Sequence, residues 1–452
     1  MITVDQTRAP HHSLSSSNKD QMQIQMQEID RTQAEMPRKG SNFINKLFLS
    51  LFYTHLVLIT ALVIFLTLRA TLSSSHNHRF HPKQWCLVVL SSTALSGIMG
   101  FSYQALTGLN PSTAFKTTFW LSPLLTCAFG VLLVLIGTPA SLAASIITLI
   151  CSILQSLYAC WANPRFKHAI KILTVSLAYY PPKVKPAIIL SIVVSIVYSS
   201  LLMLGIGGAT ATGTKINLLF IFLILASLTW TTQIIKNTMQ VMVSHVKYMQ
   251  FACGIEVDFK TVAKITGRYS MGSICMGSIL VPVITVIWGW ARAVSLVSGD
   301  VDEFMFSCAS CCSGAASRIV AYGNRWGFVH VGVYNKGIVR ASMDTWEMFT
   351  RNGIEELVNC DLTSSFCFLC GVATGSVCGL VGGTWALFIH RSYATEVSIY
   401  VFLIGYFTNR VAMSWVQASV TAYYVAYAEN PESQQFDNTI PAYLRELQRS
   451  QV

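Results

Sequence analysis

The sequence predicts an all-α protein, a polytopic transmembrane helical bundle of about ten spans with an inner interfacial helix. Of its 452 residues, 53% are apolar and only 11% are charged, whereas soluble domains carry about 25% charged residues. The mean hydropathy is +0.51, and the apolar residues form long blocks. A soluble enzyme is therefore excluded. A disulfide scaffold is excluded because the 13 cysteines are spread over the whole length.

Long apolar blocks define the predicted spans, because a helix needs roughly 20 mostly apolar residues to cross a bilayer. A tenth, weaker candidate at 303–320 is rich in small residues, so neighbouring helices would have to shield it. The nine strong candidates are 47–68, 85–106, 117–137, 140–161, 186–206, 216–238, 269–292, 364–389 and 398–421.

The basic residues favour ten spans with both termini in the cytosol. They lie mainly in short loops, which is a topology signal rather than a nucleic-acid-binding stripe. The loop that would lie outside after 269–292 holds Asp300, Asp302 and Glu303, and the basic stretch from Arg318 to Arg351 falls inside only if 303–320 crosses. The loop after the first span is an exception, with basic residues outside.

Composition divides the chain into three parts. Residues 1–46 are polar and rich in Gln and Ser, which predicts a disordered cytosolic arm. Residues 47–428 form the predicted transmembrane domain, and 429–452 a short cytosolic tail. Between the fourth and fifth strong spans, Asn163-Pro164 and Pro181-Pro182 bracket a short amphipathic stretch, which predicts a helix lying in the inner interface.

Small residues mark two helices for close packing or gating. Gly371, Gly375, Gly379 and Gly383 recur every four residues in 364–389, where a bare face permits close helix contact. Such a face serves static packing or lets two bundles rock during transport. In 269–292, Gly272 and Gly277 precede a mid-span Pro282, which predicts a kink or break.

The nine strong spans hold no Asp or Glu, which argues against a small metal cation as substrate. A soft organic cation can be held by aromatic faces instead. The candidate substrate-binding residues are Tyr198, Trp230, Trp288 and Tyr406.

Other polar groups within the apolar blocks are few. Arg410 is a functional candidate because a charge at membrane depth is costly, and a lipid phosphate or an acidic inner-loop residue would partner it. His55 and His390 are candidate proton relays. The cysteine clusters at 308–312 and 367–370 lack the second half of a zinc site. We find no catalytic motif and expect no cofactor, bound metal or enzymatic activity.

Several motifs follow one another in a recognisable order. GSICMGSIL at 272–280, CASCCSG at 308–314, the segment 322–352 and ASVTAYYVAYAENPE at 418–432 resemble the choline transporter-like family, solute carrier family 44, also called plasma-membrane choline transporters. The resemblance covers roughly 45–432. It implies a ten-span carrier with cytosolic termini that moves choline or a related amine such as ethanolamine. Many members have a long extracellular loop after the first span, whereas about 16 residues follow it here.

The preferred interpretation is a facilitative or proton-exchanging carrier for choline-like organic cations, with the acidic outer loop attracting the substrate. The expected partners are this solute and membrane lipids, without nucleic acid. The plasma membrane is the expected location, with an internal membrane as the alternative. Two other functions remain open: a transporter or scramblase of lipid headgroups that uses Arg410, and a non-transporting trafficking scaffold.

Overall fold

The computed structural model describes residues 39–73, 82–178, 184–211, 216–297, 314, 318–389 and 391–450. It divides into two units, Met1–Ile44 and Asn45–Val452, of which the second holds the bundle. Within the described residues every regular element is a helix, as the sequence predicts. The longer helices are α2 (Lys39–Ser73), α3 (Pro82–Leu109), α4 (Pro111–Ile136), α5 (Pro139–Ala162), α7 (Val184–Ala211), α8 (Ile216–Cys253), α10 (Met271–Val297), α15 (Thr363–Ile389), α16 (Ala394–Ala412) and α17 (Ser414–Glu429).

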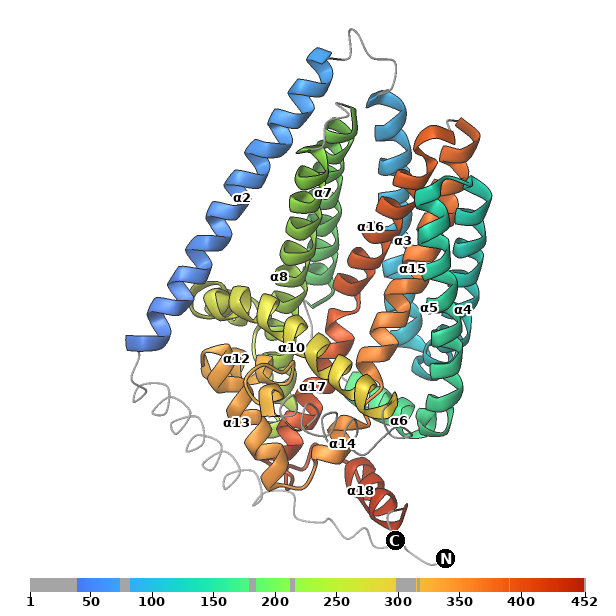
Figure 1. Cartoon of the computed structure of the whole chain (residues 1–452). Coiled ribbons are helices and arrows are strands. Elements are labelled where there is room, and N and C mark those ends of the chain that lie inside the picture. The colour runs from blue at the N-terminus through green and yellow to red at the C-terminus, as the bar shows by residue number, and fades with distance from the viewer. Residues whose placement is uncertain are drawn as a thin grey trace, which may run out of the picture. The chain divides into compact units, whose positions relative to one another are not determined.

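Shorter helices connect and cap the bundle. They are α6 (Phe166–Leu177), α9 (Phe259–Ile265), α12 (Gly327–Tyr334), α13 (Ile338–Arg351), α14 (Glu355–Asn359) and α18 (Thr439–Ser450). Helices α6, α13, α14 and α18 gather at one end of the bundle, which we call the α13 end (Figure 1). There α6 and α14 each pack against α18, so the predicted tail contains a packed helix.

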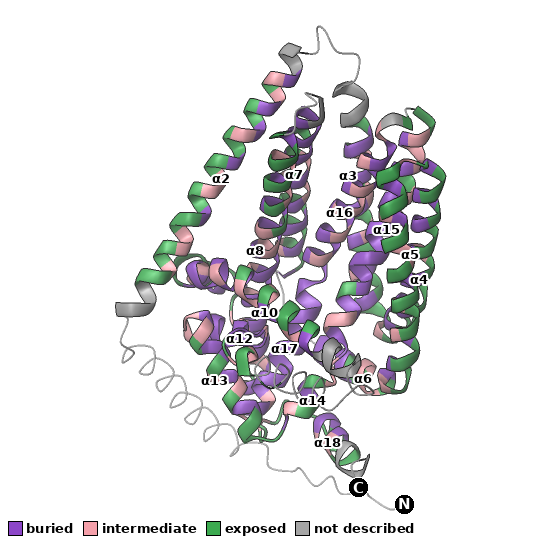
Figure 2. Cartoon of the chain, viewed as in Figure 1, coloured by how far each residue is buried: buried purple, intermediate pink, exposed green. Residues whose placement is uncertain are grey.

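The α15–α16 pair forms the most extensive helix contact and lies between two neighbouring layers. Helices α4 and α5 flank α15, whereas α3 and α7 flank α16 (Figure 1). Helix α8 packs against α7 and α17, and α17 is buried along almost its whole length (Figure 2). The outward faces of α4, α5 and α7 expose leucine, isoleucine and valine, as expected for helices in contact with lipid.

Seven helices in the described part of the chain are long and apolar enough to cross a membrane. The chain is therefore a polytopic α-helical membrane protein. All nine strong predicted spans coincide with helices, α2, α3, α4, α5, α7, α8, α10, α15 and the α16–α17 pair. The segment 303–320 lies almost entirely outside the described residues, so ten spans stay a prediction.

Two predicted spans differ from the observed helices. The block 398–421 is not one straight helix, because α16 ends at Ala412 and α17 begins at Ser414. Met413 adopts φ −85° and ψ 2°, yet its N–H still donates to the Asn409 carbonyl, so the helix bends without losing that bond. Helix α8 continues to Cys253, 15 residues beyond the predicted end at 238, because its later polar residues are buried by α17 and α12.

The bracketed stretch after α5 does form a short helix. A 3₁₀ turn at Asn163–Arg165 leads into α6. Its apolar residues Phe166 and Leu173 are buried, and the Phe166 ring packs 4.7 Å from Phe119 of α4. This face therefore contacts the protein core, whereas the interfacial-helix hypothesis placed it against lipid.

The glycines of α15 contact two helices rather than one. Gly371 and Gly375 face Tyr406 and Phe402 of α16, whereas Gly379 faces Phe129 of α4. Gly383 reaches both helices. Each four-residue step turns about 40° beyond a full helical turn, so the glycine stripe winds from one neighbour to the other. The glycine stripe therefore accounts for the close packing of α15 against both α16 and α4.

Helix α10 runs unbroken through Pro282, so the predicted break there is wrong. The irregular part of this segment is a π-helical turn at Thr266–Ser270, just before α10. Gly272 and Gly277 allow close contact with Asn45 of α2 and Phe328 of α12. Figure 1 shows α10 crossing α7 and α8 obliquely, so these glycines serve contacts between inclined helices.

Substituting Gly375 with alanine should destabilise the bundle. A Cβ atom there would lie 2.8 Å from the Phe402 carbonyl oxygen of the α16 backbone, so the two helices would have to separate. We expect a loss of about 1–3 kcal/mol, measured by thermal unfolding of the purified protein. Gly289→Ala is the matched control, because a Cβ at Gly289 meets nothing within 4 Å. Equal melting of both variants would contradict the prediction.

Candidate functional site

Two cationic side chains meet between α8, α15 and α16. Lys236 of α8 is only 8% exposed, and Arg410 of α16 lies close enough to interact with it electrostatically. The fully buried Cys367 of α15 is within electrostatic reach of both. Within the described residues, no hydrogen bond or ion pair joins Lys236 to another protein group. We call the space between these residues the central cleft.

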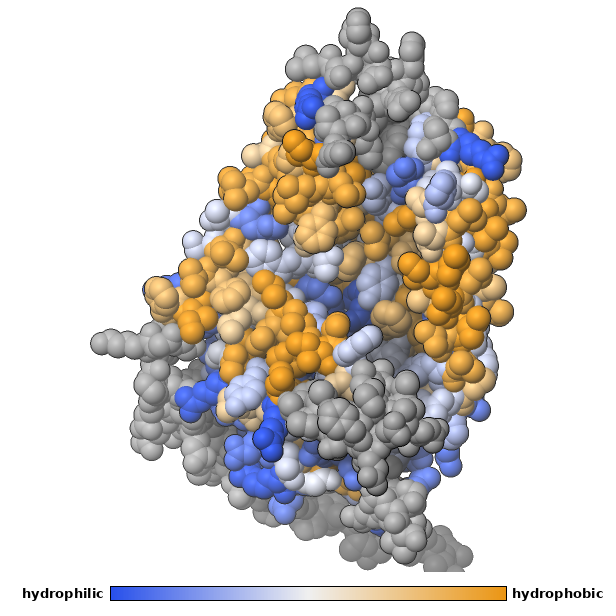
Figure 3. Space-filling view, in the orientation of Figure 1, coloured by the Kyte–Doolittle hydropathy of each residue, from blue (hydrophilic) through white to orange (hydrophobic). Residues whose placement is uncertain are grey.

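Buried polar atoms without a protein partner are concentrated around Arg410. Its Nε and Nη1 atoms belong to this set. Figure 3 shows that one face of the molecule is hollowed, with hydrophobic surface on both sides and hydrophilic residues in its depth. Buried polar groups are normally hydrogen-bonded, so this region has the chemistry of a binding site. Other buried polar atoms of α16 and α17 without a protein partner among the described residues include Glu396 Oε2, Thr408 Oγ1, the side-chain oxygen and nitrogen of Asn409, Ser414 Oγ and Gln417 Oε1.

Tyr406 lies one helical turn before Arg410, on the same side of α16. A Cβ at Gly371 would meet the Tyr406 ring at 3.0 Å and Cδ of Arg410 at 3.2 Å, so both side chains cover this glycine. The Tyr406 ring makes edge contacts with Phe368, 6.0 Å away, and with Phe407, 5.2 Å away. The Tyr406 ring therefore lies beside the Arg410 side chain, and the two residues are about 6 Å apart along the helix axis.

Tyr198 and Trp230 come together elsewhere. The Tyr198 hydroxyl lies 2.6 Å from Ser227 Oγ, which also lies 2.9 Å from His55 Nε2, and the His55 ring lies 4.9 Å from Trp230. This group joins α2, α7 and α8. Ser227 and Lys236 are nine residues apart, about half a turn around α8, so the group faces away from the central cleft.

Trp288 is separate from both groups. It lies near the C-terminal end of α10, whereas Trp230 donates to the Cys275 carbonyl near the start of that helix, at 3.5 Å. The 13 residues between Cys275 and Trp288 correspond to about 20 Å along the helix. The four predicted substrate residues therefore do not form one aromatic cage.

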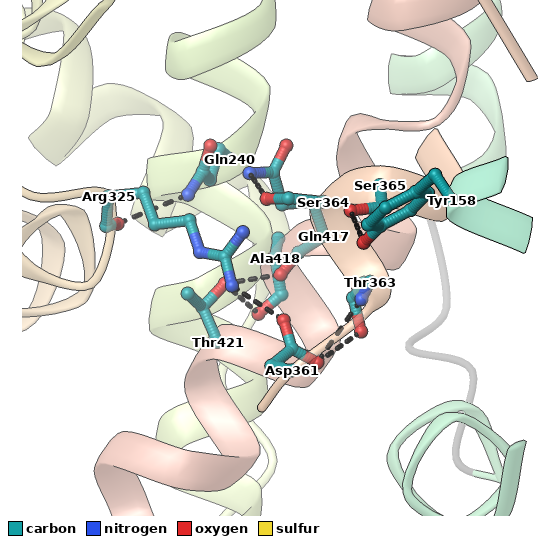
Figure 4. A network of polar contacts seen from close by, with 10 residues as sticks. All are labelled: Tyr158, Gln240, Arg325, Asp361, Thr363, Ser364, Ser365, Gln417, Ala418 and Thr421. Carbon is teal, nitrogen blue, oxygen red and sulfur yellow. Dashed lines mark hydrogen bonds and ion pairs between the residues drawn. The ribbon is translucent and has the colours of Figure 1, made fainter. Parts of the chain in front are cut away.

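A polar network around Arg325 and Asp361 joins residues of several helices (Figure 4). Arg325 Nη2 lies 2.5 Å from Asp361 Oδ2, whose side chain is 3% exposed. The other Asp361 oxygen accepts from the backbone N–H and hydroxyl of Thr363, at 3.2 and 2.7 Å. Gln240 of α8 donates to the Arg325 carbonyl, at 3.3 Å. The network ties α8 and the start of α15 to the segment before α12.

A second cluster lies nearer the α13 end. Glu429, at the end of α17, accepts a short hydrogen bond from Tyr334 and lies 3.6 Å from His330 Nε2. Burial raises the pKa of Glu429, but His330 and the Tyr334 hydroxyl stabilise the carboxylate more strongly, so the pKa is lowered. Glu429 also lines a pocket of about 570 Å³ with Asp344, Arg351 and others.

Several sequence candidates lie outside the described residues. They are Asp300, Asp302, Glu303, His390 and the cysteines at 308–312. In the part of the chain that the structure describes, no group of three His, Cys, Asp or Glu side chains could hold a metal. Sequence reasoning missed Lys236, although it lies inside the predicted span 216–238, and the Arg325–Asp361 pair. Counting the charged residues inside each predicted span would have identified Lys236.

Comparison with known families agrees with this architecture. The model of the family described as plasma-membrane choline transporter matches residues 139–432, which is more than half of the chain. The protein belongs to this family. The matched region contains Lys236, Arg410 and helices α6, α13 and α14, and it confirms the resemblance inferred from the motifs.

Fungal members of the choline transporter family are similar over part of their length. The chain is 28% identical to the protein PNS1 of Cryptococcus neoformans over 172 residues, 36% of this chain and 31% of the relative. It is 23% identical to PNS1 of Mycosarcoma maydis over 250 residues, 50% of this chain and 45% of the relative. The chain thus spans about a third to a half of the length of the curated relatives it matches.

Neutralising Asp361 in this choline transporter family member should strongly destabilise it. Asp361→Asn leaves Arg325 without its anionic partner in a buried position, which costs about 3–5 kcal/mol. Asp344→Asn is the control, because the Lys336–Asp344 pair has a similar separation of 2.6 Å but is more exposed and should contribute less than about 1 kcal/mol. Thermal unfolding of both variants checks this. Similar melting temperatures would contradict a structural role for the buried pair.

The carboxylate of Glu429 should make stability depend on pH. Because its folded pKa lies below the ordinary value of 4.5, its contribution is present above pH 4.5 and is lost as the pH falls through the folded pKa. We expect wild type to exceed Glu429→Gln by about 1 kcal/mol at pH 7, since the side chain is partly exposed. Melting curves from pH 7 to pH 3 should show this difference shrinking below pH 4.5. A constant difference would refute it.

Proposed function

We propose that this protein carries choline or a choline-like organic cation, including ethanolamine, across a membrane by alternating access, as a facilitative or proton-exchanging carrier. Its family membership supports transport of a choline-class solute. The observation that carries the assignment is the aromatic group beside the central cleft. Tyr406 lies beside Arg410 and contacts the edges of Phe368 and Phe407, which places three aromatic rings next to the basic groups.

A quaternary ammonium group suits this environment. It has no N–H to donate, so it is held by ring faces, at about 0.5–2 kcal/mol for each ring. Phe368 of α15 is 45% exposed, which leaves its ring accessible. Tyr198 and Trp230 face α2 instead. We therefore assign them to the packing of α2 against α7 and α8.

The helix contacts support alternating access. The glycines of α15 give α16 a smooth surface, and the bend at Met413 separates α16 from α17 directly after Arg410. Broken or bent helices beside a polar site recur in carriers that expose the site alternately to each side. We therefore place the movement of alternating access at the Met413 bend rather than at Pro282.

We further propose the plasma membrane as location, with both termini in the cytosol. The α13 end carries many of the basic residues, including Arg340 and Arg351 of α13, which is typical of the cytosolic side. The attraction of a cationic substrate by Asp300, Asp302 and Glu303 stays a prediction, because these residues lie outside the described residues.

Purified protein in liposomes should take up radiolabelled choline above the level of empty liposomes, with ethanolamine as competitor. Uptake is expected to saturate, because a carrier has a limited number of binding sites. Uptake equal to that of empty liposomes would refute the proposed function.

Replacing the Tyr406 ring should weaken choline binding. We expect Tyr406→Ala to raise the dissociation constant about fivefold, which corresponds to about 1 kcal/mol for one cation–ring contact. Tyr406→Phe keeps the ring and should bind nearly as wild type. Trp288→Ala is the control for loss of an aromatic side chain away from the cleft. Binding of radiolabelled choline measures all three, and unchanged affinity in Tyr406→Ala would remove this ring from the site.

A further inference from the structure

We propose that the central cleft prefers a zwitterion, a choline-like or ethanolamine-like ammonium group linked to a phosphate, over the free amine. In this arrangement Lys236 and Arg410 bind the phosphate and Tyr406 contacts the ammonium group. This inference rests on the proposed function, because it names the substrate class of the same site. The inference adds a phosphate, the anionic half, to a ligand whose ammonium group contacts the aromatic rings.

The charge of the cleft requires an anion. Lys236 is more than nine-tenths buried and has no hydrogen-bonding partner among the described residues. Arg410 presents Nε and Nη1, both buried and unpaired. The two groups lie within electrostatic reach of each other, and a phosphate placed between them would accept hydrogen bonds from both. A guanidinium edge with two free N–H groups matches two phosphate oxygens.

The described carboxylates on the adjoining elements do not neutralise this pair. Asp361 is held by Arg325 and by Thr363. Glu396 is near the start of α16, 14 residues before Arg410 and so roughly 20 Å along the helix. The positive charge of Lys236 and Arg410 is therefore available to a ligand.

The spacing of the two halves fits one small molecule. Tyr406 and Arg410 are one turn apart on the same face of α16, about 6 Å along the axis. In a phosphate ester of choline or ethanolamine, a two-carbon linker joins the ammonium group to the phosphate. Such a molecule can contact the Tyr406 ring and the Arg410 guanidinium together, whereas free choline leaves the cations without an anion.

Competition binding on the full-length protein tests the preference. Radiolabelled choline is bound to purified protein in a maltoside detergent, and unlabelled choline or phosphocholine displaces it. In wild type, we expect phosphocholine to displace the radiolabelled choline at a concentration about 10-fold lower than unlabelled choline does. In Lys236→Gln and Arg410→Gln this advantage should fall to less than twofold.

Two further variants separate a local effect from a general one. Lys247→Gln removes another buried lysine of α8, whose Nζ donates to the Ser176 carbonyl at 2.8 Å, and it should keep the full advantage. Arg410→Lys retains the charge and should keep part of it. The melting temperature of each variant shows whether it is folded. If Arg410→Gln does not fold, the phosphocholine advantage measured in Lys236→Gln and Arg410→Lys decides whether the proposal holds.

A second arm identifies the source of the phosphate. Fluorescent phosphatidylcholine is followed in liposomes of phosphatidylcholine and phosphatidylserine that contain the full-length protein. Lipid exchange between leaflets that slows about 10-fold in Lys236→Gln indicates a lipid headgroup as the ligand. Exchange at the protein-free rate, together with a phosphocholine preference, indicates a soluble ester. Either result supports the phosphate site.

The proposal is overturned if phosphocholine has no advantage over choline in wild type and lipid exchange does not depend on Lys236 or Arg410. It is also overturned if the advantage persists in both glutamine variants. These outcomes differ from failure of the proposed function, which would be observed as the absence of choline uptake into liposomes. If choline does not bind at all, direct binding of radiolabelled phosphocholine replaces the competition measurement.

Discussion

The close contact between α15 and α16 determines where the polar groups of the interior lie. Gly371 leaves room for both Tyr406 and Arg410, and Gly375 brings the α15 backbone against the Phe402 carbonyl. Lipid provides no hydrophobic drive between helices, so such small-residue contacts have to supply the packing. Because α16 is held this closely, the side chains of Tyr406 and Arg410 lie directly over Gly371 of α15.

Burial of two basic groups without a carboxylate partner is energetically costly. Each unpaired ion costs several kcal/mol after relaxation, and the Arg325–Asp361 pair shows that the fold can neutralise a buried charge where it needs only stability. Lys236 and Arg410 lie close by without a carboxylate. A cost of this kind, retained beside a satisfied pair, is typical of a site in which a ligand provides the missing charge.

The sequence was sufficient for the helices and insufficient for the cleft. Blocks of 20 apolar residues located α2, α3, α4, α5, α7, α8, α10 and α15 because hydropathy reflects the lipid that surrounds them. The bend at Met413 was missed since no glycine or proline marks it. Lys236 was missed because a lysine two residues before a predicted helix end normally reaches the interface, whereas α8 continues to Cys253 and buries it. Tyr198 and Tyr406 were both aromatic candidates, but only tertiary packing shows that they lie on different sides of α8.

The same helix connects the cleft with the α13 end. Helix α17 begins directly after the bend, carries Gln417 beside the cleft, and ends at Glu429 in contact with Tyr334 of α12. Polar atoms near its start lack protein partners, whereas the carboxylate at its end contacts a tyrosine and a histidine. The end of α17 is therefore anchored by polar contacts, while its start next to Arg410 depends on what occupies the cleft. In the proposed carrier, binding energy gained at Arg410 would act at the bend, the point where α16 meets α17.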